Sequence, residues 1–296
     1  MSIAKPNLFI VGAAKAGTSS LHDILNQHDD ICMSSVKEPH FFSEVSQLKN
    51  NDPWHTLKTS NEKEYLSLWA NGDYKYLGES SPSYMWDQKA CHRISAFNPA
   101  SKIIMLLRDP VMRAYSHYLM DFQSNREKRS SFLRALADDK GREPKGWGIS
   151  RLYEELGFYS APINNYQQTF GKNNVLVLFY EELFNNLTSQ MLKFWDFLDI
   201  APSTVTLQHK NASTNYTSFG KMVKKVGIGN LINSKIKDKL KSLILTERKA
   251  SLGDLEIRRL IEIYRNDILL QKELGFSFYY DYFKTQYHID LASVST

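Results

Sequence analysis

Short apolar runs recur along the chain, and longer segments with apolar positions at helical spacing separate them. We expect strands over residues 8–11, 76–78, 102–107 and 175–180. We expect helices over residues 19–26, 62–69, 89–97, 111–122 and 189–198. Short strands that alternate with helices are typical of an α/β fold with a parallel sheet. The pattern therefore predicts a three-layer fold, in which helices flank both faces of a central, mainly parallel sheet.

The remaining segments are less regular. Residues 138–150 carry Gly141, Pro144, Gly146 and Gly148, which predict a mobile loop over one edge of the sheet. The C-terminal part reads as a loop and then as helical, and it ends in an aromatic cluster: Phe276, Phe278, Tyr279, Tyr280, Tyr282 and Phe283. We expect this cluster to dock the helical C-terminal part onto the body of the protein. No internal repeat is visible, so we expect residues 1–296 to form a single domain.

Composition and charge narrow the possible functions. The 296 residues are 42% hydrophobic, which allows a substantial core and argues against general disorder. The formal net charge of +5 suits an anionic ligand. The sequence has no dense basic arm, so nucleic acid is not an expected partner.

The sequence gives no sign of metal binding or of membrane insertion. Cys32 and Cys91 do not form a Cys-x-x-Cys pair, and no histidine or cysteine stands at metal-ligand spacing, so we expect buried thiols and no metal. No segment approaches the roughly 18–20 apolar residues that a membrane span needs. The N-terminus has no signal-peptide pattern. We therefore expect a cytoplasmic protein without stable membrane insertion, and the oligomeric state stays open.

A glycine-bounded loop joins the first expected strand to the first expected helix. It reads Gly12-Ala13-Ala14-Lys15-Ala16-Gly17-Thr18-Ser19-Ser20. Backbone N–H groups converge in such a loop, and the helix N-terminus adds partial positive charge, so the loop predicts a phosphate-like ligand. A nucleoside-triphosphatase loop carries lysine directly after the second glycine, but here Thr18 follows Gly17 and the lysine is Lys15. This placement indicates an anion other than a Mg-bound triphosphate, and the alternative is a tight turn without a ligand.

A second anion signal follows the most apolar strand. Arg108 comes directly after the run 102–107, at the carboxyl end of a strand, where open α/β sheets bind ligands. Asp109 and Pro110 suit the N-cap and the first position of the next helix. Ser116 stands eight residues after Arg108. A guanidinium and a hydroxyl suit a second phosphate, whereas a structural ion pair for Arg108 is an equally good interpretation.

A third signal is a loop with two proton acceptors. In Lys37-Glu38-Pro39-His40-Phe41-Phe42, proline breaks any helix and the aromatic pair anchors the loop. Glu38 and His40 can each accept a proton, although on their own a solvated carboxylate and imidazole are the better interpretation. The segment Gly78-Glu79-Ser80-Ser81-Pro82-Ser83-Tyr84 adds hydroxyls at another strand end and is otherwise an ordinary hydrophilic connection.

Taken together, these motifs resemble the sulfotransferases that use 3′-phosphoadenosine 5′-phosphosulfate (PAPS), in the style of the heparan-sulfate-type and bacterial branch. The resemblance covers about the first 200 residues, in the family's motif order. It implies that Lys15, Ala16, Gly17, Thr18, Ser19 and Ser20 hold the 5′-phosphosulfate. Arg108 and Ser116 look like the pair that holds the 3′-phosphate. Tyr180, in a segment like the family's strand-end motif, would lie near the adenosine. The fold that this family implies is P-loop-like.

The resemblance also implies catalytic roles. Glu38 takes the proton from the acceptor, with help from His40, and Lys15 donates to the oxygen that bridges sulfur and phosphorus. No metal is required, because lysine and the helix terminus supply the positive charge. The late Arg-Lys-Gly-x-x-Gly motif of other branches is missing after Thr206. Lys210, Asn211 and Ser213 match only loosely the basic loop that closes over the cofactor in heparan-type enzymes.

The acceptor is not fixed by these motifs. The resemblance implies a hydroxyl or amine on a small polar metabolite, a natural product or a glycan. Aromatic residues that could line its pocket are Trp54, Trp86, Trp147 and Tyr153, and core packing is at least as good an interpretation for each. The competing functions are a P-loop nucleotide kinase or NTPase, and a non-catalytic nucleotide-binding protein. Thr18 and Arg108 disfavour the first, and the combination of Lys15 with Glu38 disfavours the second.

Overall fold

The computed structural model describes residues 5–44, 61–207, 215–216, 245–246 and 252–292. Its centre is a five-stranded sheet in the order β2-β3-β1-β4-β5, and every pairing in it is parallel. The strands are β1 (Leu8–Gly12), β2 (Ile31–Met33), β3 (Tyr76–Ser80), β4 (Lys102–Leu107) and β5 (Val175–Phe179). A separate antiparallel pair joins β6 (Asn215–Tyr216) to β7 (Leu245–Thr246).

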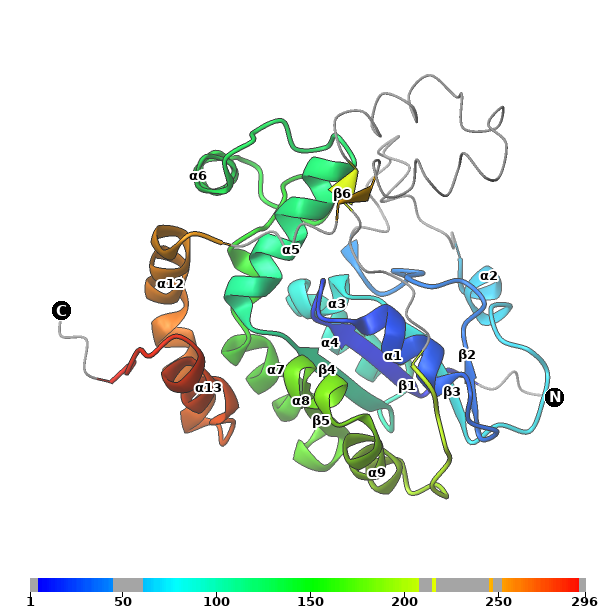
Figure 1. The fold of residues 1–296 in the computed structure, drawn as a ribbon. Helices are drawn as coiled ribbons and strands as arrows, with labels where there is room; N and C mark the ends of the chain where they lie inside the picture. Colours follow the sequence, from blue (N-terminus) through cyan, green and yellow to red (C-terminus); the bar gives the residue numbers. More distant parts are fainter. Residues whose placement is uncertain (1–4, 45–60, 208–214, 217–244, 247–251, 293–296) are drawn as a thin grey trace, which may run out of the picture.

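Helices cover both faces of the sheet (Figure 1). Helices α3, α4 and α7 lie on one face, whereas α1, α8 and α9 lie on the other. The helices are α1 (Thr18–Leu25), α2 (Glu62–Leu66), α3 (Ser83–Trp86), α4 (Gln88–Phe97), α5 (Pro110–Gln123), α6 (Phe132–Lys140), α7 (Ser160–Phe170), α8 (Tyr180–Asn185), α9 (Leu187–Leu198), α12 (Asp254–Glu273) and α13 (Phe278–Gln286). Short 3₁₀ turns occupy Glu155–Gly157 and Lys172–Asn174. The predicted three-layer α/β fold is confirmed.

Sequence and structure differ where the periodicity is weak. β2 has only three residues, too few to show a pattern, and it was not expected. The helices α3, α6 and α7 were also not expected. Residues 138–140 belong to α6, so the prediction of a loop from 138 to 150 is wrong at its start. Tyr180 begins α8 and is not the last residue of the preceding strand.

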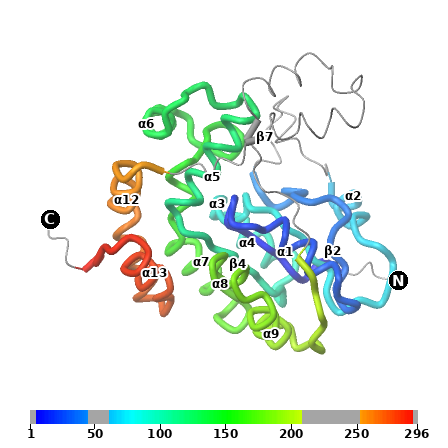
Figure 2. Tube along the Cα trace, in the orientation of Figure 1, coloured from blue at the N-terminus to red at the C-terminus, as the bar shows by residue number. Residues whose placement is uncertain are grey.

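The C-terminal helices pack against the body, as the aromatic cluster predicts. Figure 2 shows α12 and α13 side by side, and α12 contacts α5 and α7. Tyr279 and Phe283 are fully buried. Buried aromatic rings bring a large apolar area out of water, which stabilises the docked position. In the described part of the chain, no helix combines the length and the apolar character needed to cross a bilayer.

Parallel pairing places the predicted motifs together. The carboxyl ends of parallel strands share one edge of the sheet, and ligands of open α/β sheets bind there. β1 lies between β3 and β4, so the loop that follows Gly12 lies between Ser80, at the end of β3, and Arg108, just after β4. β5 is next to β4 and ends before Tyr180. Four segments far apart in the sequence therefore meet at this edge.

Candidate anion-binding and proton-accepting site

The glycine-bounded loop needs both of its glycines. Gly17 has φ 90°, in the left-handed region, and a Cβ there would lie 2.8 Å from the Phe184 ring and 3.1 Å from the Tyr180 ring. A Cβ on Gly12 would lie 2.6 Å from Met85 Sδ. The Ala13 amide donates to the Leu106 carbonyl at 2.7 Å, which ties the loop to β4. The loop is therefore held in one conformation between the sheet and two aromatic rings.

The loop ends at a helix start that no side chain caps. Gly17 is the N-cap of α1 and offers no side-chain acceptor to the first-turn N–H groups. The first turn begins with Thr18, Ser19 and Ser20, whose hydroxyls lie beside these amides in sequence. Uncapped N–H groups at a helix N-terminus, together with the helix dipole, favour a bound anion.

Lys15 is half-buried in this loop, and among the described residues its ammonium has no strong hydrogen-bond acceptor. The hydrogen bond that the structure gives to Nζ goes to the thioether Sδ of Met120, at 3.3 Å. A thioether is a weak acceptor. Burial lowers the pKa of Lys15, and the Arg108 guanidinium lowers it further, whereas the carboxylates of Asp121 and Glu38 oppose the shift. An anion placed at the loop would restore the charge balance of this ammonium.

Arg108 joins the loop to the strand end of β5. Its Nη1 donates to the Lys15 carbonyl at 2.9 Å, and its guanidinium lies 4.8 Å from the centroid of the Tyr180 ring. The Tyr180 ring in turn lies 4.6 Å from the Phe184 ring. Three residues predicted from separate motifs, Lys15, Arg108 and Tyr180, are thus brought together.

Ser116 is half-buried on α5, and no hydrogen bond joins it to Arg108 in the described part of the chain. Met120 stands four residues later, so it shares a helix face with Ser116. Since Met120 contacts the Lys15 ammonium, the Ser116 face of α5 is turned toward the loop. The position of Ser116 on α5 therefore suits the predicted pairing with Arg108 around a ligand.

Asp109 caps α5 as predicted and is part of a buried polar cluster. Its Oδ1 accepts from the Val111 amide at 2.9 Å, and Pro110 is the first helical residue. Its Oδ2 accepts a hydrogen bond from the hydroxyl of Tyr287, after α13. The Asp109 amide donates to Glu181 at 2.9 Å. Burial raises the pKa of Asp109 to about 7, although the Tyr287 hydroxyl opposes this shift. The C-terminal segment thus stabilises the connection between β4 and α5, which contains Arg108.

Glu38 lies in a turn whose backbone is strained. Glu38 has φ 59° and His40 has φ 55°, a region that residues other than glycine rarely adopt. The Glu38 carboxylate forms an ion pair with Lys37 and lies 3.6 Å from His40 Nε2. Burial would raise the pKa of Glu38, but His40 and Lys37 together hold it well below its usual range. The carboxylate is therefore ionised at neutral pH and able to accept a proton.

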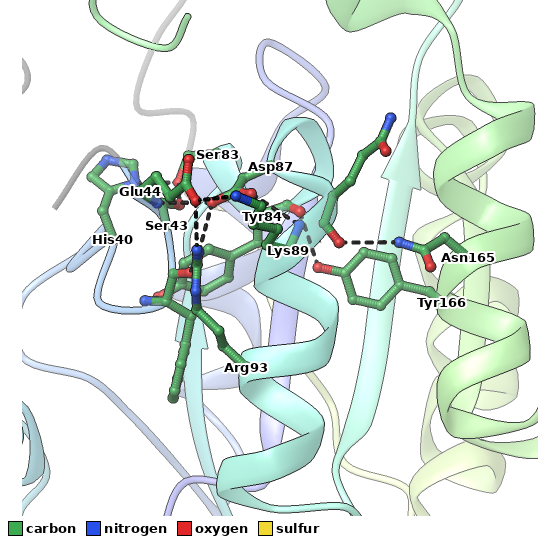
Figure 3. A network of polar contacts seen from close by, with 12 residues as sticks. His40, Ser43, Glu44, Ser83, Tyr84, Asp87, Lys89, Arg93, Asn165 and Tyr166 are labelled. Carbon is green, nitrogen blue, oxygen red and sulfur yellow. Dashed lines mark hydrogen bonds and ion pairs between the residues drawn. The ribbon is translucent and has the colours of Figure 1, made fainter. Parts of the chain in front are cut away.

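His40 is buried between Glu38 and a serine pair. Its Nδ1 lies 2.7 Å from Ser83 Oγ, which is itself 2.5 Å from Ser43 Oγ. Figure 3 shows His40 and Ser43 beside Ser83 at the start of α3. The Trp147 ring lies 5.8 Å from the His40 ring. The predicted closeness of Glu38 and His40 is thus present, and Trp147 borders it.

The outcome differs for the other predicted residues. Lys210, Asn211, Ser213 and Trp54 lie outside the described residues. Tyr153 is fully buried, and its hydroxyl donates to Asp121 at 3.2 Å, so it is not a pocket-lining residue. Cys32 and Cys91 are buried free thiols, as predicted.

Sequence reasoning missed two residues near the site. Met120 contacts Lys15. The sequence signal for Met120 was its position four residues after Ser116, which places both on one face of the helix. Glu79 is a fully buried carboxyl group in β3, behind the Glu38 loop. Its signal was an acidic residue inside a strand that is mostly buried, a placement that needs hydrogen-bond partners.

Comparisons with known proteins agree on one family. The sulfotransferase domain family matches residues 5–272. Human carbohydrate sulfotransferase 15 is 25% identical over 251 residues, which cover 67% of this chain and 44% of that protein. Human heparan sulfate glucosamine 3-O-sulfotransferase 6 is 30% identical over 198 residues, which cover 66% of this chain and 52% of that protein. The chain thus spans about half the length of the curated relatives it matches. A solved sulfotransferase from Alicyclobacillus acidocaldarius is 27% identical, with a TM-score of 0.64 over 88% of this chain and 96% of that one.

Proposed function

This chain belongs to the sulfotransferase family, and on that premise we propose that it transfers a sulfuryl group from PAPS to a hydroxyl or amine of an acceptor. One observation carries the proposal. The half-buried Lys15 ammonium, whose hydrogen bond goes to a thioether, lies in a loop that leads into an uncapped helix start, and Arg108 and Tyr180 border this loop. A glutamate held in its ionised form lies close enough to Lys15 to influence its pKa.

The residues fit a donor with two separated phosphate groups. The first-turn amides of α1 and the Lys15 ammonium would hold the 5′ end, with hydroxyls from Thr18, Ser19 and Ser20. The Arg108 guanidinium and the Ser116 hydroxyl would hold the 3′-phosphate. The Tyr180 ring, already stacked on Arg108, would border the adenosine. PAPS, when bound, supplies the sulfuryl group and a phosphate that accepts negative charge as the group leaves.

The chain's own residues then have separate roles. Glu38 accepts the proton of the acceptor hydroxyl or amine, and His40 holds the Glu38 carboxylate from its Nε2 side. Lys15 stabilises negative charge that develops at the 5′ end. The loop from Gly12 to Gly17 fixes Lys15 in place, so this stabilisation requires little rearrangement.

The first test is a calorimetric titration with 3′-phosphoadenosine 5′-phosphate (PAP), without added metal. We expect PAP to bind at least about tenfold tighter than 5′-AMP, because one charge-assisted contact is typically worth about 1.5–3 kcal/mol. ATP with Mg²⁺ is the comparison for a nucleotide kinase. Preference for ATP, or no binding of PAP, would overturn the sulfotransferase assignment.

One variant tests which end of the donor Arg108 binds. Arg108→Ala should weaken PAP binding by about tenfold or more and change 5′-AMP binding much less, because only PAP carries the 3′-phosphate. Equal losses for both ligands would mean that Arg108 acts through the loop carbonyl of Lys15 and not on the 3′-phosphate.

We propose a sugar as the acceptor. Two relatives are named for carbohydrate and heparan sulfate glucosamine, and the Trp147 ring beside His40 offers an apolar face of the kind that sugar rings stack on. Transfer from labelled PAPS should be at least about tenfold faster to a glucosamine-containing oligosaccharide than to a simple phenol, a difference of about 1.4 kcal/mol. Faster transfer to the phenol would favour a small aromatic metabolite. Binding of PAP without transfer to any acceptor would favour a non-catalytic protein.

A further inference from the structure

Glu79 is a buried carboxyl group that three hydroxyl groups surround. Its Oε1 accepts from the Tyr65 hydroxyl at 2.6 Å and from the Tyr84 hydroxyl at 2.8 Å. Its Oε2 accepts from Ser81 Oγ at 2.7 Å. The side chain is fully buried, so these hydroxyls replace water as its partners. Nothing in the proposed reaction uses this carboxylate directly.

Two of the three hydroxyls also bind the loop that carries Glu38 and His40. Ser81 Oγ accepts from the His40 amide at 3.1 Å. The Tyr84 hydroxyl accepts from the Phe42 amide at 3.3 Å. Among the described residues, the Tyr65 hydroxyl donates to Glu79 and makes no hydrogen bond to the loop, although the Tyr65 ring stacks on Phe41 with the ring centroids 4.2 Å apart.

The strained turn needs such anchors. Positive φ values are unfavourable for residues other than glycine, so those at Glu38 and His40 persist only where neighbouring groups fix the backbone. The Glu38 amide donates to the Ser80 carbonyl at 3.1 Å, and the His40 amide donates to Ser81 Oγ. Both acceptors belong to the segment that follows Glu79 in sequence.

Glu79 also decides the direction of these hydrogen bonds. A hydroxyl has one hydrogen, and an ionised carboxylate can only accept. When the Ser81 and Tyr84 hydroxyls donate to Glu79, their lone pairs are left for amide donors, which the His40 and Phe42 N–H groups supply. A protonated carboxyl or an amide at this position donates from one of its two terminal atoms, so a hydroxyl that faces this atom has to turn its hydrogen away, toward the loop, where it would oppose the amide.

We propose that Glu79 is a positioning residue: through the hydroxyls of Ser81 and Tyr84 it holds the Glu38–His40 turn in the geometry that proton transfer needs. The proposal rests on the proposed function in so far as Glu38 is the base. Glu79 itself contacts no reacting atom in this scheme.

The proposal predicts a pH dependence of turnover. Burial raises the pKa of Glu79 to about 7, although the hydroxyls of Tyr65, Ser81 and Tyr84 oppose the shift. Tyr166, on α7, is the other titratable group that interacts with Glu79, and burial raises its pKa well above the usual value. Of these groups only Glu79 ionises near neutrality, so kcat should rise with pH through about 7. Glu79→Gln should be slower and should lose this rise.

The chain offers a matched set of variants for the test. Ser81→Ala and Tyr84→Phe each remove a hydroxyl that links Glu79 to the loop, whereas Tyr65→Phe removes one that does not. At about pH 8.5, above the raised pKa of Glu79, we expect kcat to fall about 10- to 100-fold in the first two variants, because small misplacements of a catalytic group are costly. In Tyr65→Phe we expect a change below about twofold. PAP affinity should stay within about twofold in all three, since the anion loop is not touched.

A second readout does not depend on activity. Amide hydrogen exchange at His40 and Phe42 should accelerate at least about tenfold in the respective linking variants and stay unchanged in Tyr65→Phe. Equal kcat losses in all three variants, or unchanged exchange and kcat in Ser81→Ala and Tyr84→Phe, would overturn the proposal. If wild type binds no PAP or transfers nothing, the proposed function fails, whereas the exchange rates still decide whether Glu79 holds the turn.

Discussion

Replacement of Lys15 by alanine is expected to lower kcat for sulfuryl transfer by about two to three orders of magnitude, as loss of a preorganised electrostatic donor typically does. The ammonium is half-buried in a loop that Gly12 and Gly17 hold against the sheet and two aromatic rings. Its hydrogen bond goes to a weak acceptor, Met120 Sδ, so little has to be broken before it interacts with a developing charge. A half-buried charge acts in a lower dielectric than water, so its effect exceeds that of a fully exposed lysine.

Two comparisons make this prediction specific. Lys15→Arg keeps the charge but not the shape and should retain more turnover than Lys15→Ala. Met120→Leu removes the thioether acceptor with little change in volume and should lower turnover by less than about threefold, because a volume-conserving swap disturbs the local packing little. Single-turnover kinetics at saturating PAPS would measure both. Near-normal turnover in Lys15→Ala would remove this residue from the chemical step.

The central strands were predictable because burial on both faces leaves an unbroken apolar run. β4 has the bounds that its sequence predicts, and Asp109 and Pro110 mark the start of α5 through capping chemistry that is local. The meeting of Lys15, Arg108 and Tyr180 could be predicted in the same way. Parallel strands deliver their carboxyl ends to one edge, so motifs at the ends of β1, β4 and β5 had to converge.

The elements and contacts that the sequence does not predict depend on interactions between distant segments. β2 is three residues long and is held by its pairing with β3, a tertiary interaction without a local pattern. α7 is rich in asparagine, glutamine and tyrosine, so its apolar stripe is faint. The hydrogen-bond partners of Glu79 are Tyr65, Ser81 and Tyr84, and only the fold brings the first of these to the other two.

The state of Glu38 was also beyond sequence reasoning. A carboxyl group in this turn could have been protonated by burial or ionised by its neighbours. The positions of His40 and Lys37 determine the direction of the pKa shift, because these residues lower the pKa of Glu38 against the effect of burial. Ionisation of Glu38 is therefore complete across the neutral range, and loss of activity between about pH 6 and 7 should come from other groups.

Glu38→Gln is expected to lower kcat by about two to four orders of magnitude while PAP affinity changes less than about twofold. Glutamine has the same shape but cannot take the acceptor's proton. A low pKa makes Glu38 a weak base toward a free hydroxyl. The proton becomes far more acidic as the acceptor oxygen bonds to sulfur, however, so a carboxylate that is fully ionised beforehand suffices.

The control for charge is another glutamate of the same segment. Glu44 pairs with Lys89 and Arg93, and its side chain is 53% exposed, so Glu44→Gln should change kcat by less than about threefold. If Glu38→Gln instead weakens PAP binding and leaves kcat intact, Glu38 acts on the cofactor loop and the base lies elsewhere. If Glu38→Gln and Glu44→Gln change kcat and PAP affinity by the same factors, the segment responds to its net charge alone. Glu38 is the group that accepts the proton only if Glu38→Gln lowers kcat without changing PAP affinity and Glu44→Gln does neither. That pattern requires a group that is needed in the chemical step and not in donor binding.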